Sequence, residues 1–286
     1  MRRARVPWLF VAPALLLYAA FYLAPTLLGA GYAFTDWNGL ESPSFVGLDN
    51  FSRIFGEAEG LGALRHTLVL CVLYVVAVNV VGLGLAVGLH GALKTRHVLR
   101  ALFFAPVVVS PLAVAYVWKF ILDPEGPLNR GLEAIGLGTL AQPWLGKPAT
   151  ATAAVLVTMV WQFSGWSMVI YLAGLQSIQA ELYEAAEIDG AGTWRRFVDI
   201  TRPLLLPALT INVSLSLIAG LMVFDQVIAL TGGGPGTATE TIATQVYEQA
   251  LVNGRFGYSA AMALTLAVAV GTLSFVQMRA MRRQEG

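Results

Sequence analysis

The chain is organised around one polar stretch, EAAEIDGAGTWRRFVDITRPLLLP, which runs from Glu184 to Pro207. It is the longest well-charged segment in an otherwise apolar sequence, and it lies between two long apolar runs. Its first half predicts a short amphipathic helix, with Ser177 as the N-cap and Gly190 as the residue of positive φ that ends it. A second helical piece is predicted over Thr193 to Ile200. The unit is therefore expected to be a helix, a turn and a second helix.

The composition places the rest of the chain in a membrane. Of its 286 residues, 57% are hydrophobic and only 12% are charged, whereas about 25% of residues are charged in soluble domains. Six apolar runs approach or exceed the roughly 20 residues that a spanning helix needs. They cover residues 8–34, 67–90, 98–122, 149–175, 204–230 and 259–281. We therefore predict an all-α integral membrane protein with six transmembrane helices, in which residues 1–286 form one membrane domain.

Lysine and arginine are distributed unevenly between the two sets of connections, and this asymmetry predicts the orientation of the chain. Five lie in the connections on one side, namely Arg53, Arg65, Arg130, Lys147 and Arg255. Twelve lie on the other side, namely Arg2, Arg3, Arg5, Lys94, Arg96, Arg100, Arg195, Arg196, Arg202, Arg279, Arg282 and Arg283. Because basic residues favour the cytoplasmic side, we predict cytoplasmic N and C termini and a cytoplasmic loop over residues 176–203.

Glycine and proline inside the apolar runs predict where helices pack or bend. Gly84 and Gly88 form a small-x-x-x-small pair, which indicates packing against another helix. Pro106 and Pro111 interrupt the third run, where proline leaves backbone groups without helical partners, so we expect a kink. Cys71 is the only cysteine, which excludes an intrachain disulfide and a thiolate metal cluster. The histidines show no ligand spacing, and no metal site is predicted.

Two connections on the less basic side also show local patterns. The connection over residues 35–66 is acidic and contains several aromatic residues. It is either a small ordered segment that touches an external partner or a solvated loop. After a turn at Asp123–Pro127, residues 128–135 predict an amphipathic helix at the membrane interface. The glycine run Gly232–Gly234 precedes Pro235 but no lysine, so it predicts an outer turn rather than a phosphate-binding loop.

The polar stretch resembles the cytoplasmic EAA loop of the permease subunits of binding-protein-dependent ABC importers. The resemblance extends over Glu184–Pro207, and its end, with Ile200, Pro203 and Pro207, looks most like the branch that carries maltose, glycerol-3-phosphate and lactose-type sugars. One departure is Gln179, where many relatives have proline. The residues that the resemblance assigns to contact with the ATPase are Glu184, Ala185, Ala186, Asp189, Gly190, Ala191 and Gly192.

The resemblance also implies a fold, a location and partners. It implies a type I ABC importer permease in the plasma membrane of a prokaryote, which forms half of the pathway for a sugar or sugar-like solute. The implied partners are a second permease subunit in a heterodimer, two ATPase subunits that use ATP and Mg, an extracytoplasmic substrate-binding protein and membrane lipid. Since the sequence has no Walker A loop, we predict a transport subunit that is not an enzyme, binds no cofactor itself and has no nucleic-acid partner.

Polar and aromatic side chains near the middle of two spans are candidates for the solute pathway. Polar groups are costly in hydrocarbon, so they are expected to face a cavity or another helix, and aromatic rings with amides and hydroxyls suit a neutral sugar. The candidates are Trp161, Gln162, Trp166, Asn212, Ser216 and Gly220. For the two tryptophans, packing and membrane-interface roles remain open. Asp225 and Gln226 are candidates for an outer gate or a partner contact, and solvation of Asp225 also remains open.

An ion-coupled secondary transporter of a small polar solute is the alternative function. Such a transporter would need buried ionisable groups, and only Lys119 and Asp225 lie within the predicted spans, both near span ends. A membrane enzyme is disfavoured because the sequence has neither Gly-x-Ser-x-Gly nor His-Glu-x-x-His. The permease subunit is therefore the leading hypothesis.

Overall fold

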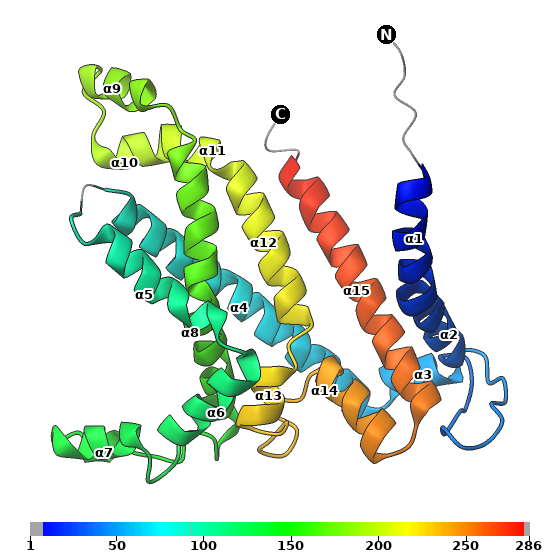
Figure 1. The fold of residues 1–286 in the computed structure, drawn as a ribbon. Coiled ribbons are helices and arrows are strands. Elements are labelled where there is room, and N and C mark those ends of the chain that lie inside the picture. The colour runs from blue at the N-terminus through cyan, green and yellow to red at the C-terminus, as the bar shows by residue number, and fades with distance from the viewer. Residues whose placement is uncertain (1–7, 92, 283–286) are drawn as a thin grey trace. The chain divides into compact units, whose positions relative to one another are not determined.

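A computed structural model describes residues 8–91 and 93–282 of the chain. Arg2, Arg3, Arg5 and Arg283, which contribute to the predicted orientation, lie outside these residues. The chain divides into two compact units, one formed by the part up to Leu61 with Gln245–Ala267, and the other by Gly62–Thr244 with the part from Val268 onward. Figure 1 labels the helices of both units.

The first unit contains the N-terminal apolar helices and the connection that follows them. Its elements are α1 (Trp8–Tyr18), the π-helix η1 (Ala19–Leu23), α2 (Ala24–Tyr32), α3 (Asp49–Gly56), η4 (Glu248–Val252) and the first part of α15 (Phe256–Arg282). The buried Asn50 amide donates to the carbonyls of Ala33 at 3.0 Å and Thr35 at 2.8 Å. The Trp37 ring stacks on Tyr32 at 4.3 Å between centroids. The connection over residues 35–66 is therefore an ordered segment rather than an unstructured loop.

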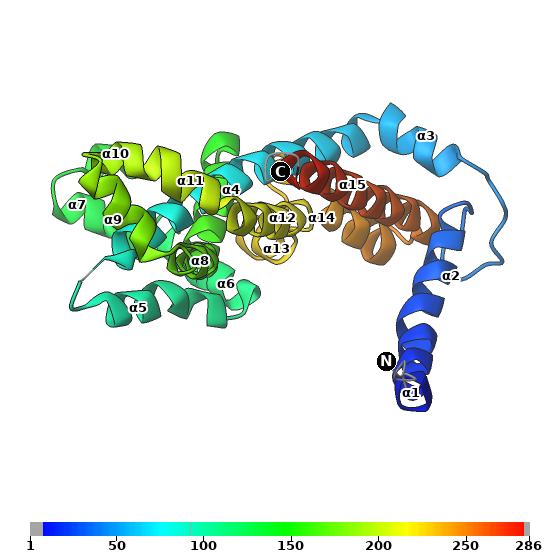
Figure 2. The same ribbon diagram turned by 90° about the horizontal axis from the view of Figure 1, so that it is seen from above.

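The second unit holds most of the long helices. Its elements are α4 (Ala58–His90, from Gly62), α5 (Arg96–Val108), α6 (Pro111–Ile121), α7 (Pro127–Ala134), η2 (Gly138–Leu140), α8 (Pro148–Gln176), α9 (Ala180–Ile188), α10 (Thr193–Arg196), η3 (Phe197–Thr201), α11 (Arg202–Leu204), α12 (Leu206–Leu221), α13 (Asp225–Leu230), α14 (Ile242–Tyr247, to Thr244) and the end of α15. α8 contacts α5 on one side and α12 on the other (Figure 2). α9 and α10 lie at one end of α8, and α6 and α7 lie at the opposite end (Figure 1). The predicted amphipathic helix over residues 128–135 is confirmed as α7.

The predicted spans correspond to four long apolar helices and two bent pairs. The four helices contain Val11–Tyr32, Ala58–His90, Pro148–Gln176 and Phe256–Met281. The bent pairs are Arg96–Val108 with Pro111–Ile121, at 100°, and Thr193–Leu204 with Leu206–Leu221, at 66°. The described residues thus contain up to six spans, if each bent pair crosses once. The all-helical membrane fold is therefore confirmed, with its third and fifth runs broken rather than continuous.

The break in the third run has a local cause. Ser110 precedes Pro111 and has extended backbone angles, φ −54° and ψ 135°, because the proline ring disfavours the helical conformation of the residue before it. The carbonyl of Val109, which is freed from the helix, accepts a hydrogen bond from the Gln162 amide at 3.0 Å. The structure therefore has a sharp bend where the sequence predicted a kink.

The fifth run ends earlier than predicted. The run over 204–230 is not one helix, since α12 ends at Leu221 and α13 begins at Asp225. The Thr241 hydroxyl donates to the Val223 carbonyl at 3.0 Å inside this break, which compensates for the lost helical bond. The sequence marks this break with Asp225 and Gln226 at the start of α13, but the apolar residues before and after them make the run look continuous by hydropathy.

Two apolar clusters form the core of the second unit. One joins α4, α8 and α13 through Tyr74, Val155 and Val227, all 2% exposed or less. The other joins α4, α8 and the segment before α12 through Ala86, Tyr171 and Leu205. Gly84 and Gly88 do not take part, because nothing lies within 4 Å of a Cβ added at either position. Within the described residues, the packing predicted for this pair is not made by this chain, whereas Gly82 packs against Ser167.

Candidate functional site

The polar stretch forms a helical elbow, which we define as residues 180–201. α9 ends in a Schellman motif, in which the amide of Ala191 donates to the Ala186 carbonyl at 2.8 Å and that of Gly190 donates to Glu187 at 3.0 Å. Gly190 has φ 73°, a conformation that is unfavourable for residues with a side chain. The predicted helix end at Gly190 is therefore confirmed, and α10 follows with Gly192 as its N-cap.

The start of the first elbow helix differs from the prediction. Gln179, not Ser177, is the N-cap residue of α9, and its side chain makes no cap hydrogen bond. The Ser177 hydroxyl instead donates to the carbonyl of Gly174 at 2.7 Å, at the end of α8. The N-cap role predicted for Ser177 is therefore wrong, because a serine between two helices can bond to the end of the first as well as to the start of the second.

Two side-chain contacts join the two arms of the elbow. The hydroxyls of Tyr183 on α9 and Thr201 on η3 are 2.9 Å apart. The Arg196 guanidinium donates to the Glu187 carboxylate at 3.1 Å. The Tyr183–Thr201 hydrogen bond is partly buried, and Thr201 is 6% exposed. If either hydroxyl were removed, water would replace the lost hydrogen bond poorly. The elbow is thus braced as one piece.

The elbow presents apolar side chains outward. Ile188 is 88% exposed, Trp194 is 76% exposed and Leu182 is 42% exposed. Glu184 and Ala185 are also exposed, on the same short helix. Exposed apolar groups beside small and charged residues are typical of a surface that another protein covers. The residues Glu184, Ala185, Ala186, Asp189, Gly190, Ala191 and Gly192 therefore lie together on an accessible elbow.

A buried polar network joins three helices of the second unit. The Oδ1 of Asn79 on α4 accepts from the Tyr171 hydroxyl at 2.6 Å and from the Asn212 amide at 3.0 Å. The Asn79 amide donates to the Ser216 hydroxyl at 3.0 Å, and Asn212 also donates to the Ser167 hydroxyl. Every member thus has a partner, which is what polar groups need in a span. We name this set, Asn79, Ser167, Tyr171, Asn212 and Ser216, the polar network.

A cavity of about 310 Å³ borders the polar network. Trp166, Ser167, Asn212 and Ser216 contribute to its wall, and Ala219 lines it as well. The remaining wall is apolar and consists of Tyr74, Val78, Val107, Phe163 and Leu215. The cavity therefore combines three aromatic rings, from Tyr74, Phe163 and Trp166, with an amide and hydroxyls in an otherwise apolar surround, which is the general composition of a site for a small polar molecule.

The remaining pathway candidates lie elsewhere in the second unit. Gln162 is fully buried and has both ends of its amide occupied, since its Oε1 accepts from Gln226 at 3.2 Å in addition to the bond to Val109. Trp161 packs edge to face on Trp118 at 5.7 Å. A Cβ on Gly220 would lie 3.0 Å from the Cys71 sulfur, so this glycine permits close packing of α12 on α4. None of these three residues lines the cavity.

The two outer candidates separate in the structure. Gln226 is 5% exposed and bonds to Gln162, so it links α13 to α8. Asp225 is the first residue of α13 and is half-buried.

Asn79, Ser167 and Tyr171, which carry much of the polar network, were not among the sequence candidates. The signal for Asn79 was present, because an amide in the middle of an apolar run requires a buried partner.

Together, the fold and these two sites define a polytopic helical membrane protein with a polar cavity among its spans and an exposed helical elbow. Residues 79–285 match the family described as "Binding-protein-dependent transport system inner membrane component". The chain belongs to this family.

Individual relatives cover nearly the whole chain. AmyD of Thermoanaerobacterium thermosulfurigenes, a probable starch degradation products transport system permease protein, is 33% identical over 97% of this chain and 94% of its own length. MsmF of Streptococcus mutans, a multiple sugar-binding transport system permease protein, is 35% identical over 97% of this chain and 96% of its own.

A solved structure supports the same assignment. A chain of a bacterial alginate ABC transporter, crystallised with an alginate pentasaccharide-bound periplasmic protein, has a TM-score of 0.83 at 25% identity, and the match covers 97% of this chain and 95% of that one. This protein is therefore a permease subunit of an ABC importer, a transport component and not an enzyme. The family assignment does not favour the alternative of an ion-coupled secondary transporter.

Proposed function

We propose that this permease subunit carries a sugar or an oligosaccharide across the plasma membrane of a prokaryote. AmyD and MsmF are named for starch products and sugars, and the structural relative was crystallised with an alginate pentasaccharide. The observation that carries the proposal is the cavity itself, which brings Trp166 together with Asn212 and Ser216. A sugar needs an aromatic face for its C–H groups and two-way hydrogen-bonding groups for its hydroxyls.

The proposed assembly has a second permease subunit, two ATPase subunits and a substrate-binding protein outside the membrane. The structural relative was crystallised with a periplasmic protein, which supports the last of these partners. In this assembly residues 1–286 act as one membrane domain that forms half of the pathway, and the ATPases use ATP and Mg.

The elbow is the proposed contact with the ATPase. It is exposed, braced by Tyr183 and Thr201, and carries uncovered apolar side chains. Closure of the ATPases on ATP binding pushes the elbow, and the helical segments η3 and α11, followed by α12 after a bend of 66°, transmit the push to the cavity wall. Asp225, at the start of α13, is proposed to lie near the outer mouth of the pathway.

A bulky side chain in the cavity tests the pathway. Ala219→Trp places an indole where Ala219 now lines the cavity, so we expect sugar uptake by the reconstituted importer to fall at least about tenfold, because the added rings occupy a large part of the volume. Ile218→Trp is the matched control, since Ile218 is 36% exposed and does not line the cavity. Uptake of radiolabelled maltodextrins, with ATP hydrolysis measured in parallel, is the readout. Equal uptake by both variants would show that the solute passes elsewhere.

A further inference from the structure

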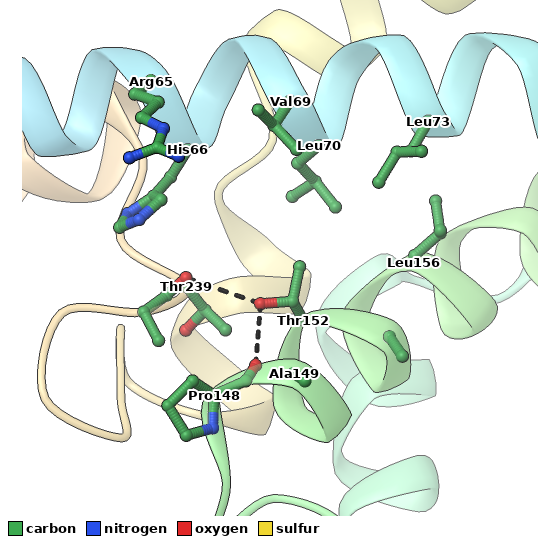
Figure 3. Close-up of a pocket in the computed structure, with 12 residues that line it drawn as sticks. Arg65, His66, Val69, Leu70, Leu73, Pro148, Ala149, Thr152, Leu156 and Thr239 are labelled. Atoms are coloured by element: carbon green, nitrogen blue, oxygen red, sulfur yellow. Dashed lines mark hydrogen bonds between the residues drawn. The ribbon is translucent and has the colours of Figure 1, made fainter.

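A second cavity of about 480 Å³ lies between α4, α8 and the loop before α14. Figure 3 shows its two halves. Arg65 and His66 point from α4 toward Thr239 at one end, and Leu70, Leu73 and Leu156 face the space at the other. None of the residues that line this cavity is acidic. The cavity is therefore amphipathic, with a basic end and an apolar end.

The polar end has unused hydrogen-bonding capacity. The Nδ1 of His66 is enclosed and has no hydrogen-bond partner among the described residues. An enclosed nitrogen without a partner is costly, so a ligand acceptor there would be favourable. Thr152 and Thr239 frame this end, but their hydroxyls are already bonded, to Pro148 at 2.9 Å and to Gly234 at 2.9 Å. Arg65 and His66 are thus the groups at this end that remain for an anion.

The position of the cavity along the helices matches one leaflet. Pro148 begins α8 and Gln176 ends it beside the elbow, and 29 residues at about 1.5 Å each span about 43 Å. This equals the full thickness of a bilayer with its headgroups, so Thr152 lies at headgroup depth, on the side opposite the elbow. From Arg65 to Leu73 the cavity extends about 12 Å along α4, which crosses α8 obliquely (Figure 1).

The apolar half is open to the side. Val69 is 47% exposed and Leu73 is 45% exposed, although both line the cavity. A molecule can therefore enter from the lipid phase while its charged end reaches Arg65. A water-soluble anion would leave these apolar side chains uncovered, and a purely apolar molecule would leave Arg65 and the His66 nitrogen unpaired.

We propose that this cavity binds an anionic phospholipid, with the phosphate on Arg65 and His66 and an acyl chain along Leu70, Leu73 and Leu156. The positive charge of Arg65 favours an anionic headgroup, and the lateral opening of the apolar half favours an acyl chain. The site is separate from the solute cavity, whose lining residues it does not share. It rests on the membrane fold and not on which solute is carried.

Lipid retention on the full chain, purified with the subunits that accompany it, tests the proposal. Native mass spectrometry would compare bound phosphatidylglycerol with phosphatidylcholine of the same chains. We expect the wild-type chain to retain phosphatidylglycerol about tenfold better, because Arg65 attracts its net negative headgroup whereas the choline cation of phosphatidylcholine offsets the phosphate charge, and we expect Arg65→Gln to abolish most of that preference. Arg130→Gln is the matched control, because Arg130 is exposed on α7 and does not line the cavity.

A photoreactive lipid locates the acyl chain independently of headgroup charge. Phosphatidylglycerol with a diazirine in its acyl chain is expected to label the peptides that contain residues 65–73 and 148–156, and Leu156→Trp is expected to remove this labelling by filling the apolar half. Unchanged headgroup preference in Arg65→Gln would overturn the proposal. Labelling confined to other segments would overturn it as well. The same holds if a second permease subunit covers this cavity and no lipid is retained there.

Discussion

At the scale of single residues, Asn79 is the most connected polar side chain among the spans. It has partners on α8 and α12 as well as a bond to the Val75 carbonyl at 2.7 Å. An amide so placed fixes the register of three helices, because each partner must lie at hydrogen-bonding distance. The same network forms part of the wall of the cavity that we propose for the solute, so the side chains that hold the helices together would also shape the proposed pathway.

Replacing Asn79 tests this role. Asn79→Ala leaves the Tyr171 hydroxyl without its acceptor and the Asn212 amide short of one partner, and we expect it to destabilise the chain by about 1 to 2 kcal/mol. The measured quantity is the melting temperature in detergent, monitored with a fluorescent dye that does not react with thiols. Val80→Ala is the control, because Val80 is 65% exposed on the next position of α4. A melting temperature unchanged by Asn79→Ala would show that the network contributes little.

Glycine positions along the spans allow a second test at this scale. A Cβ on Gly165 would overlap the backbone carbonyl of Phe103 on α5, so Gly165→Ala is expected to cost about 1 to 3 kcal/mol through overpacking. Gly84→Ala meets nothing within 4 Å and gains helix propensity of up to about 1 kcal/mol. The two variants should therefore shift the melting temperature in opposite directions. Equal destabilisation by both would mean that another subunit packs closely on Gly84.

At the scale of elements, the elbow is a rigid piece whose turn depends on one backbone conformation. Gly190 supplies the positive φ, and the two arms are braced through Tyr183 and Thr201. The elbow ends with η3 and continues into α11, and α12 follows at a bend of 66°. A rigid elbow transmits a displacement, whereas a loosely held loop would absorb it.

Proline at the turn should uncouple the importer. Gly190→Pro is expected to abolish ATP-driven uptake, because proline fixes φ near about −65° and removes the amide that donates to Glu187. Gly190→Asn is the control, since asparagine tolerates the left-handed conformation, and it should retain most of the uptake. Both are measured in vesicles that contain the partner subunits, with membrane insertion checked by immunoblot. Normal uptake by the proline variant would argue strongly against coupling through this turn.

At the scale of the whole molecule, the distribution of charge predicts the orientation in the membrane. The elbow and the predicted cytoplasmic connections carry most of the lysine and arginine residues, whereas α7 lies at the opposite end of α8 from the elbow (Figure 1). If the elbow meets the ATPase, α7 faces the outside. The single cysteine, Cys71, is 1% exposed, which makes a cysteine-free background simple to prepare.

Labelling with a membrane-impermeant maleimide tests this orientation. On a Cys71→Ala background, Glu133→Cys on α7 is expected to react in intact cells, and Glu181→Cys on α9 only after the cells are opened. Both positions are exposed in the structure, so a difference reports the side of the membrane rather than burial. Reaction of Glu181→Cys in intact cells would reverse the proposed topology and remove the ATPase contact from the elbow.

The amino-acid sequence was sufficient for the features that depend on neighbouring residues. The apolar runs, the elbow with its turn at Gly190 and the bend before Pro111 all follow from local chemistry, because helical period, positive φ and the proline ring act within a few residues. The pattern from Glu184 to Pro207 also identified the family. The Ser177 cap was predicted wrongly, because the same hydroxyl can donate to a carbonyl at the end of α8 or accept from an amide at the start of α9. Local sequence does not decide between these two hydrogen bonds.

Contacts between distant segments required the folded chain. Asn79 and Asn212 are 133 positions apart, and nothing in either sequence neighbourhood selects the other as a partner. Gln162, a predicted pathway residue, bonds to the freed backbone carbonyl of Val109 and to Gln226, two partners far from it in sequence. Leucine, valine and alanine give the same apolar signal in the sequence, so the sequence does not show which helix faces meet. The faces that meet, and the cavities that remain between them, are decided when the helices pack and each buried amide finds a hydrogen-bond partner.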